Sequence, residues 1–324
     1  MHMMVAGRRL KLHRKKRRSH DEVDLPIIAH ATAYDEIYNN KRFENFFSTF
    51  EHIFEDGGHN YKVTVGVTKD PLPGESDHHP TGRQPRALIV VFRGTANLDN
   101  VFKDMKYSQE DFGNIDRCQG CLVHGGIWEA YTKLKQKLLE KLTALLSQYK
   151  SRTDIHIHHV IFTGHSLGGA MANLAAYNFC HRRNEAQRDP NNALFNMFNV
   201  ETVSLITFGS PRVGNTAFKQ HMETQLGLRY NFRVIYGNDP ITSAPPRIIG
   251  EVIGDLKYEF EHAGTEIRYA IDNFEDPHRA NDTRDTCGNQ TFKFVDIVRG
   301  LMDIGDHTQY KRINYRKLWQ EITK

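Results

Sequence analysis

The 324-residue sequence predicts an α/β fold in which a mostly parallel sheet is covered by helices. From about residue 25 onward, short β-branched runs alternate along the chain with segments of helical periodicity. A glycine-rich turn at residues 164–168 joins one of these apolar runs to an alanine-rich helical segment. Hydrophobic residues make up 39% of the chain and charged residues 25%, which excludes a disordered or fibrous protein. We expect one domain over residues 25–324, preceded by a poorly ordered basic tail over residues 1–24.

Five short runs are rich in apolar and β-branched residues and predict strands. Between the second and third of them, residues 127–149 carry one apolar stripe at helical spacing, which predicts a helix packed on the sheet. The Pro- and His-rich segment 71–85 and the polar segment 182–192 predict surface loops. The predicted strands are residues 62–68, 86–92, 154–163, 201–208 and 231–236.

The positive charge of the chain belongs to its first residues. The formal net charge is +4, yet residues 8–18 hold eight of the 43 Lys and Arg residues, and residues 1–18 contain no acid. The remainder has 35 basic and 39 acidic residues, a net charge of −4. Nucleic acid is therefore not predicted as a partner, because a nucleic-acid-binding domain carries its basic surface on the folded part. The tail fits a polyanion-binding or nuclear-import patch, a propeptide ending at a multibasic processing site, or a solvated terminus without a role.

The sequence shows neither a membrane span nor a secretory signal. No stretch reaches the roughly 18 apolar residues of a spanning helix. The first 25 residues lack the apolar core of about 7 to 15 residues that a signal peptide needs. Taken alone, this favours a cytoplasmic chain with no integral membrane segment. The four cysteines permit one or two disulfides and leave the compartment open.

The turn Gly164-His165-Ser166-Leu167-Gly168 predicts a serine nucleophile. A GxSxG pentapeptide alone is a weak signal, because composition alone would produce one in roughly one chain in ten of this length. Here it lies between an apolar strand and a helix rich in small residues, where two glycines let strand and helix approach closely. We therefore interpret Ser166 as a nucleophile and not as an idle serine in a glycine-rich turn.

A serine hydroxyl needs a histidine to take its proton and a carboxylate to orient that histidine. In a strand–turn–helix setting of this kind, the chain order is serine, acid, histidine. Asp239 follows an apolar run, which puts it in a loop at the carboxyl edge of the sheet, close to the serine. Aspartate in a loop is ordinarily a turn former, so its position after the strand is what favours Asp239, with Asp255 as the second candidate.

The histidine is harder to assign because the chain has 18 of them. Chain order removes those before Asp239 and leaves His262, His278 and His307. His307 lies 68 residues after Asp239, which leaves room for a last helix or strand before it. We favour His307 as the base, with His262 as the second candidate.

Six segments of the chain are typical of one known family: FRGT at 92–95, CLVHGG at 121–126, TGHSLGGA at 163–170, TFGSPRVGN at 207–215, NDPITSAPP at 238–246 and GDHTQY at 305–310. Through them, most of the chain after about residue 28 resembles the class 3 (fungal-type) triacylglycerol lipase family. Several independent motifs match in the right order, and the cysteine pair and the last motif look most like those of secreted yeast lipases. The resemblance implies an α/β-hydrolase fold, hydrolysis of lipid esters without a cofactor, and a triad of Ser166, Asp239 and His307.

An oxyanion hole and a lid are also expected. The backbone N–H of Leu167 points toward a developing oxyanion by construction of the turn, and the resemblance implies Thr95 as the second donor. Residues 96–106 carry apolar side chains at i, i+3, i+4 and i+7, which is typical of an amphipathic helix. An ordinary helix packed on the core has the same pattern, but in the resembled family this segment is the lid over the serine. The apolar lid positions are Leu98, Val101, Phe102 and Met105.

The remaining motifs concern the compartment and possible metal sites. Cys118 and Cys121 permit a redox pair or half a zinc site, whereas the resemblance favours a tight disulfide in a secreted protein. Glycosylation sequons at Asn281 and Asn289 matter only in that compartment. His156 and His158 lack an accompanying ligand set, so no metal site is predicted. The resemblance favours secretion or the endomembrane lumen.

The expected partner is a lipid ester at an oil–water or membrane interface, and the sequence predicts no oligomeric state. Phospholipase A1, mono- or diacylglycerol lipase and feruloyl-type esterase remain alternatives, because a fold does not determine a substrate. A catalytically silent lipid-binding protein is disfavoured, since all three triad candidates and Thr95 are present.

Overall fold

The computed structural model describes residues 44, 46–55, 57, 61–72, 82–94, 108–111, 118–188, 200–249, 258–271, 273, 275, 277–279, 306–313 and 315–323. The basic tail, Thr95, the four lid positions, Asp255 and both sequons lie outside these residues. Within them, no helix combines the length and apolarity that crossing a membrane requires.

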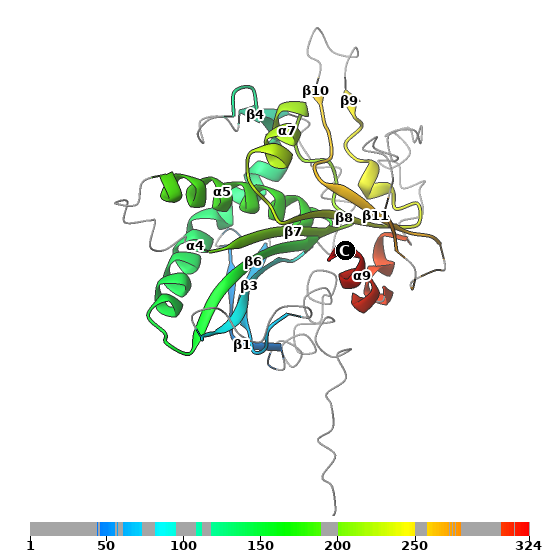
Figure 1. Ribbon diagram of the computed structural model, residues 1–324. Coiled ribbons are helices and arrows are strands. Elements are labelled where there is room, and N and C mark those ends of the chain that lie inside the picture. Colours follow the sequence, from blue (N-terminus) through cyan, green and yellow to red (C-terminus); the bar gives the residue numbers. More distant parts are fainter. Residues whose placement is uncertain are drawn as a thin grey trace, which may run out of the picture.

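An eight-stranded sheet forms the centre of the protein, in the order β1-β2-β3-β6-β7-β8-β11-β12 (Figure 1). The neighbours from β3 through β6, β7 and β8 to β11 are parallel, whereas β1, β2 and β12 pair antiparallel at the two edges. The mostly parallel sheet and all five predicted strands are confirmed. The strands are β1 Phe47–Phe54, β2 Lys62–Thr68, β3 Gln84–Phe92, β6 Ile155–His165, β7 Thr202–Phe208, β8 Tyr230–Tyr236, β11 Thr265–Tyr269 and β12 His278–Arg279.

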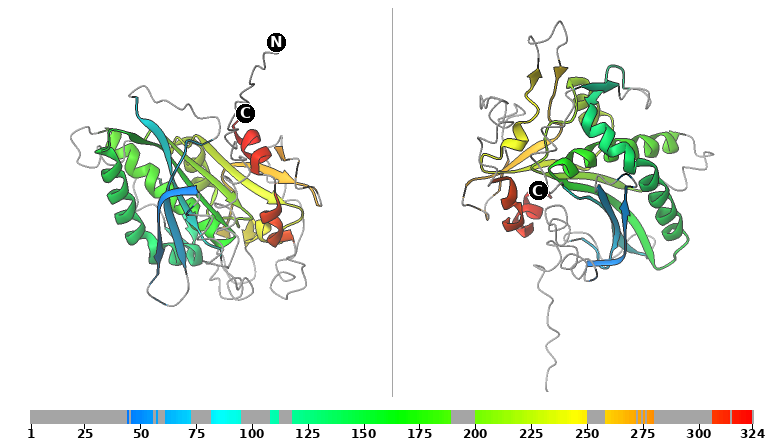
Figure 2. Two further views of the ribbon diagram at one scale, coloured as in Figure 1. Left: turned by 90° about the horizontal axis from the view of Figure 1, so that it is seen from below. Right: turned by 180° about the vertical axis from the view of Figure 1, so that it is seen from behind.

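Both faces of the sheet are covered, which explains why its central strands are apolar throughout. In β3, Leu88 and Val90 belong to one buried cluster and Ile89 and Val91 to the other, since successive side chains point to opposite faces. Helices α4 (Gly125–Lys150) and α5 (Leu167–Arg188) pack on the first face, and α9 (Tyr315–Ile322) with the 3₁₀ segment η4 (Asp306–Arg312) packs on the second (Figures 1 and 2).

The predicted helix over residues 127–149 is confirmed as α4. Its buried side chains include every position of the apolar stripe, among them Leu134, Leu138 and Leu142. The smaller elements are β4 Gln109–Asp111, β5 Leu122–His124, α7 Thr216–Thr224, η2 Pro240–Ser243, β9 Ile248–Ile249 and β10 Tyr258–Glu259.

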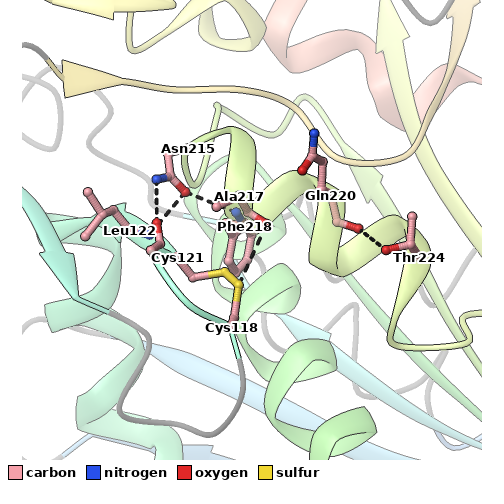
Figure 3. Close-up of a disulfide and its surroundings, with 9 residues drawn as sticks. Cys118, Cys121, Leu122, Asn215, Ala217, Phe218, Gln220 and Thr224 are labelled. Carbon is pink, nitrogen blue, oxygen red and sulfur yellow. Dashed lines mark hydrogen bonds between the residues drawn. A yellow bond between two sulfur atoms is a disulfide. The ribbon is translucent and has the colours of Figure 1, made fainter.

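A disulfide joins Cys118 and Cys121 just before β5, as the resemblance implies (Figure 3). Asn215, the N-cap of α7, holds the same loop: its side chain accepts from the N–H of Leu122 at 3.1 Å and donates to the carbonyl of Gly120 at 2.8 Å. The disulfide and the hydrogen bonds of Asn215 therefore both stabilise the loop that connects to β5, next to α7. Among the described residues, no three potential metal ligands lie together.

Burial of a histidine at the start of α4 makes stability depend on pH. The Nδ1 atom of His124 accepts the N–H of Gly126, and burial lowers the pKa of His124 from 6.5 to about 4. The unfolded chain therefore takes up a proton between pH 6.5 and 4 that the folded chain does not. Stability should fall by about 3 kcal/mol as the pH drops through this range.

The matched variant is His124→Asn, because asparagine can keep the cap but does not titrate. Urea unfolding at pH 7, 5.5 and 4.5 should show a shallower loss of stability in this variant than in the wild type. All other titrating groups contribute equally to both proteins. An equal loss of unfolding free energy with falling pH in the two proteins would therefore contradict the lowered pKa of His124.

Candidate active site

Ser166 lies at the turn between β6 and α5 in a strained backbone conformation. Its φ of +57° is the only positive φ of a non-glycine residue in the described part of the chain. The glycines on either side are required by space: a Cβ on Gly164 would lie 2.4 Å from the carbonyl oxygen of Gly168, and one on Gly168 would lie 2.4 Å from that of Phe92. The N–H of Ser166 donates to Phe208 on β7 at 2.9 Å, which ties the turn to the sheet.

Asp239 directly follows β8 and is 2% exposed. One carboxylate oxygen, Oδ1, accepts the N–H of Ile241 at 2.9 Å and caps η2. The other, Oδ2, accepts from Nδ1 of His307 at 2.8 Å and from the hydroxyl of Tyr310 at 2.6 Å. A buried carboxylate needs such donors, because each unsatisfied charge removed from water is costly.

His307 lies in η4 and is fully buried. Because its Nδ1 donates to Asp239, the neutral ring has an unprotonated Nε2 that can accept a proton. Among the described residues, neither this Nε2 nor Oγ of Ser166 has a hydrogen-bond partner. Neither buried atom is engaged by another group, so the hydroxyl stays available as a proton donor and Nε2 as a proton acceptor.

His165, the residue before Ser166, contacts the same imidazole. Its ring centroid lies 4.3 Å from that of His307, and its Nε2 donates to the backbone carbonyl of His307 at 2.9 Å. Burial and the neighbouring His307 hold the pKa of His165 well below its ordinary value. The structure therefore brings the three predicted triad residues together. Asp239 bonds His307 directly, and Ser166 is linked to His307 through its neighbour His165.

A glycine makes room for the acid–base pair. Gly209 follows β7 with a φ of +54°, and a Cβ there would lie 2.7 Å from Oδ2 of Asp239 and 3.1 Å from Cε1 of His307. Any larger residue at Gly209 would push the carboxylate and the imidazole apart.

Sequence analysis missed two residues that hold η4 in place. The hydroxyl of Tyr310 accepts the N–H of Tyr236 at 3.1 Å in addition to donating to Asp239. Oδ2 of Asp306 accepts the N–H of Asn238 at 2.9 Å. Both residues lie in the matching segment at 305–310, so the motif contained the signal, but only spatial contact assigns their partners.

The second histidine candidate has a different partner. His262 is 5% exposed, and its Nε2 donates to the carbonyl of Thr242 at 2.7 Å, so it supports the loop of η2 and not the carboxylate. His278 lies on the edge strand β12. Leu167 is the first residue of α5, where backbone N–H groups have no partner within the helix. Thr95 and the lid positions lie outside the described residues, and the roles assigned to them stay predictions.

The sequence model of the family described as lipase (class 3) matches residues 89–248. Over these residues, which are just under half of the chain, the protein resembles the class 3 lipase family. Among curated relatives, the chain is 28% identical over 188 residues to a secreted mono- and diacylglycerol lipase of Fusarium solani, an alignment that covers 58% of this chain and 48% of the relative. It is 26% identical over 264 residues to the chloroplastic phospholipase A1-Igamma2 of Arabidopsis thaliana, which covers 74% of this chain and 46% of the relative. The chain thus spans about half the length of these relatives.

Among solved structures, lipase II from Rhizopus niveus matches with a TM-score of 0.59 at 20% identity, covering 90% of this chain and 93% of that chain. The likeness identifies the fold, and the expected α/β-hydrolase fold is confirmed.

Substituting each of the two candidate histidines should have opposite effects on esterase activity. His307→Ala should lower esterase activity at least about a thousandfold, because the hydroxyl of Ser166 loses its proton acceptor. His262→Gln keeps a donor for the carbonyl of Thr242 and should retain activity within about threefold. Initial rates on a soluble short-chain ester, with circular dichroism to check folding, distinguish the two. An active His307→Ala protein or an inactive but folded His262→Gln protein would transfer the assignment.

Proposed function

We propose that the protein is a class 3 lipase, a serine hydrolase that cleaves carboxylic esters of lipids, with triacylglycerol as its main substrate class. The observation that carries the proposal is the hydrogen bond between Asp239 and Nδ1 of His307, beside a Ser166 hydroxyl that lies on a strained turn. This arrangement has the three functions of a catalytic triad: nucleophile, base and orienting acid.

The reaction proceeds in two stages. Oγ of Ser166 attacks the ester carbonyl while Nε2 of His307 takes its proton, and Asp239 stabilises the imidazolium that forms. His307 then gives the proton to the leaving alcohol, which leaves an acyl group on Ser166. A water molecule, deprotonated by His307, releases the fatty acid. No cofactor takes part in these steps.

The tetrahedral oxyanion needs donors that are in place before the reaction. The N–H of Leu167, at the start of α5, is the first, and Thr95 is proposed as the second. Removing one such donor typically lowers the rate by about 100- to 1,000-fold. The proposed lid, with Leu98, Val101, Phe102 and Met105 as its apolar positions, would control access of lipid to Ser166 at an interface.

Two alternative substrates come from the relatives. The Fusarium protein is named a mono- and diacylglycerol lipase, and the Arabidopsis protein a phospholipase A1. A feruloyl-type ester is a further alternative. Secretion is proposed as well, since the Fusarium relative is named as secreted and Cys118 and Cys121 form a disulfide. Alkylation of protein isolated from its natural source should find this pair oxidised, and free thiols there would contradict secretion.

Covalent labelling tests the activity class. A fluorophosphonate probe should label the wild type, and the adduct should map to Ser166 by peptide mass spectrometry. Ser166→Ala should lose labelling and at least about a thousandfold in turnover while remaining folded. The matched control is Ser210→Ala, because Ser210 is another buried serine, whose hydroxyl donates to the carbonyl of Pro211 at 3.1 Å, and this variant should still be labelled.

A hydrolysis panel then tests the substrate class. We expect faster release of fatty acid from a triacylglycerol emulsion than from diacylglycerol or from phosphatidylcholine vesicles, with soluble feruloyl esters slowest. Preferential hydrolysis of phosphatidylcholine would replace triacylglycerol by phospholipid as the substrate. A folded wild type that neither reacts with the probe nor hydrolyses any ester would refute the proposed hydrolase activity. That result would favour the alternative of a catalytically silent lipid-binding protein.

A further inference from the structure

We infer that His165 is a positioning residue that aligns His307 with Ser166 through a hydrogen bond to the backbone of the base. The inference rests on the proposed function and extends it to a residue outside the triad. Its basis is that the side chain of the residue directly before the proposed nucleophile contacts the main chain of the proposed base.

The base needs such an anchor because it comes from a distant and short element. His307 lies 142 residues after His165 in η4, a seven-residue 3₁₀ segment. The bond to Asp239 fixes the tautomer of the imidazole, but one bond at Nδ1 does not fix the main chain that carries the ring. The bond from His165 fixes the backbone of His307, so side chain and main chain are held from two sides.

The position of His165 makes this bond a direct link to the nucleophile. His165 ends β6 and Ser166 follows it in the strained turn, where the backbone packs so closely that neither Gly164 nor Gly168 could carry a side chain. Any shift of His307 along the surface of the sheet would have to break the 2.9 Å bond and the ring contact at 4.3 Å. The separation between Oγ of Ser166 and Nε2 of His307 is thereby set by one rigid turn.

Packing alone does not account for a histidine here. Its Nε2 donates to a carbonyl, so the neutral ring leaves Nδ1 unprotonated, and this atom has no hydrogen-bond partner among the described residues. A buried acceptor without a partner costs about 1–3 kcal/mol. Phenylalanine would fill a similar volume without that cost but would provide no donor for the carbonyl of His307.

The charge state of His165 also suits the reaction. Its ring, which is 3% exposed, lies against the imidazole of His307 and the phenol of Tyr310, whose centroid is 5.3 Å away. Asp239 contacts both of these neighbours but not His165. A neutral ring at this place adds no positive charge beside the imidazolium that forms on His307 during attack. The donor is therefore supplied without electrostatic repulsion.

Two substitutions separate the hydrogen bond from the ring. His165→Phe keeps an aromatic ring and removes the donor, whereas His165→Gln keeps an N–H donor at a similar reach and removes the ring. We expect His165→Phe to lower kcat on a soluble short-chain ester, and the rate constant of fluorophosphonate labelling, by at least about tenfold, as loss of one hydrogen bond can. KM should change less than about twofold. His165→Gln should recover both rates to within about threefold of the wild type.

The matched control is His159→Phe. His159 is a second buried histidine on β6, fully buried and bonded to Oγ of Ser204 at 2.8 Å. It lies six residues before His165, roughly 20 Å along an extended strand. This variant should lower the melting temperature but leave kcat and the labelling rate at wild-type values.

The outcomes separate the inference from the proposed function. An unlabelled, inactive wild type would refute the proposed function itself. A labelled wild type together with a folded His165→Phe variant of equal kcat would refute only the role of His165. If His165→Phe does not fold, His165→Gln decides: near wild-type rates in a folded protein support the hydrogen bond, and a tenfold or larger loss of kcat contradicts it.

Discussion

The candidate site depends on the hydrogen bonds that the buried carboxylate of Asp239 accepts. The carboxylate accepts hydrogen bonds from the backbone of Ile241, the imidazole of His307 and the phenol of Tyr310. A carboxylate removed from water costs several kcal/mol unless donors of this kind compensate it. These bonds therefore favour a conformation in which the loop after β8 and η4 lie together. In this conformation, Nε2 of His307 lies on the side of the ring away from the carboxylate.

The proposed nucleophile is held in a different way, by steric contact. A serine at a φ of +57° is strained by about 1–3 kcal/mol, and such a conformation persists only where the surroundings over-determine it. Here Gly164 packs closely against Gly168, and Gly168 against the end of β3, and the N–H of Ser166 bonds the carbonyl of Phe208 on β7. His165 connects the two halves of the site, because it belongs to the rigid turn and bonds the backbone of the base. The proposed proton transfer from Ser166 to His307 therefore depends on both constraints at once.

The sequence predicts much of this, and the parts it misses have physical reasons. Strands such as β3 are apolar on both faces, so composition alone identifies them. Strand β11 escapes detection because it contains Glu266 and Arg268, whose charges are compensated within the sheet by each other and by Arg233 on β8. The order rule reduces 18 histidines to three, but the contacts that distinguish His307 from His262 form between residues 68 and 20 positions apart. The roles of Tyr310 and His165 are likewise defined only by distant partners.

The central claim is that Asp239 orients His307 for proton transfer from Ser166, and replacing the carboxylate by its isosteric amide tests it most directly. The measurement is the rate constant for fluorophosphonate labelling of Asp239→Asn, with circular dichroism to establish that the protein is folded. In a triad of this kind, asparagine favours the wrong tautomer of the histidine and lowers the rate about 10⁴-fold. The account predicts a loss of that order in a folded protein. A folded Asp239→Asn variant that is labelled within about tenfold of the wild-type rate would contradict it.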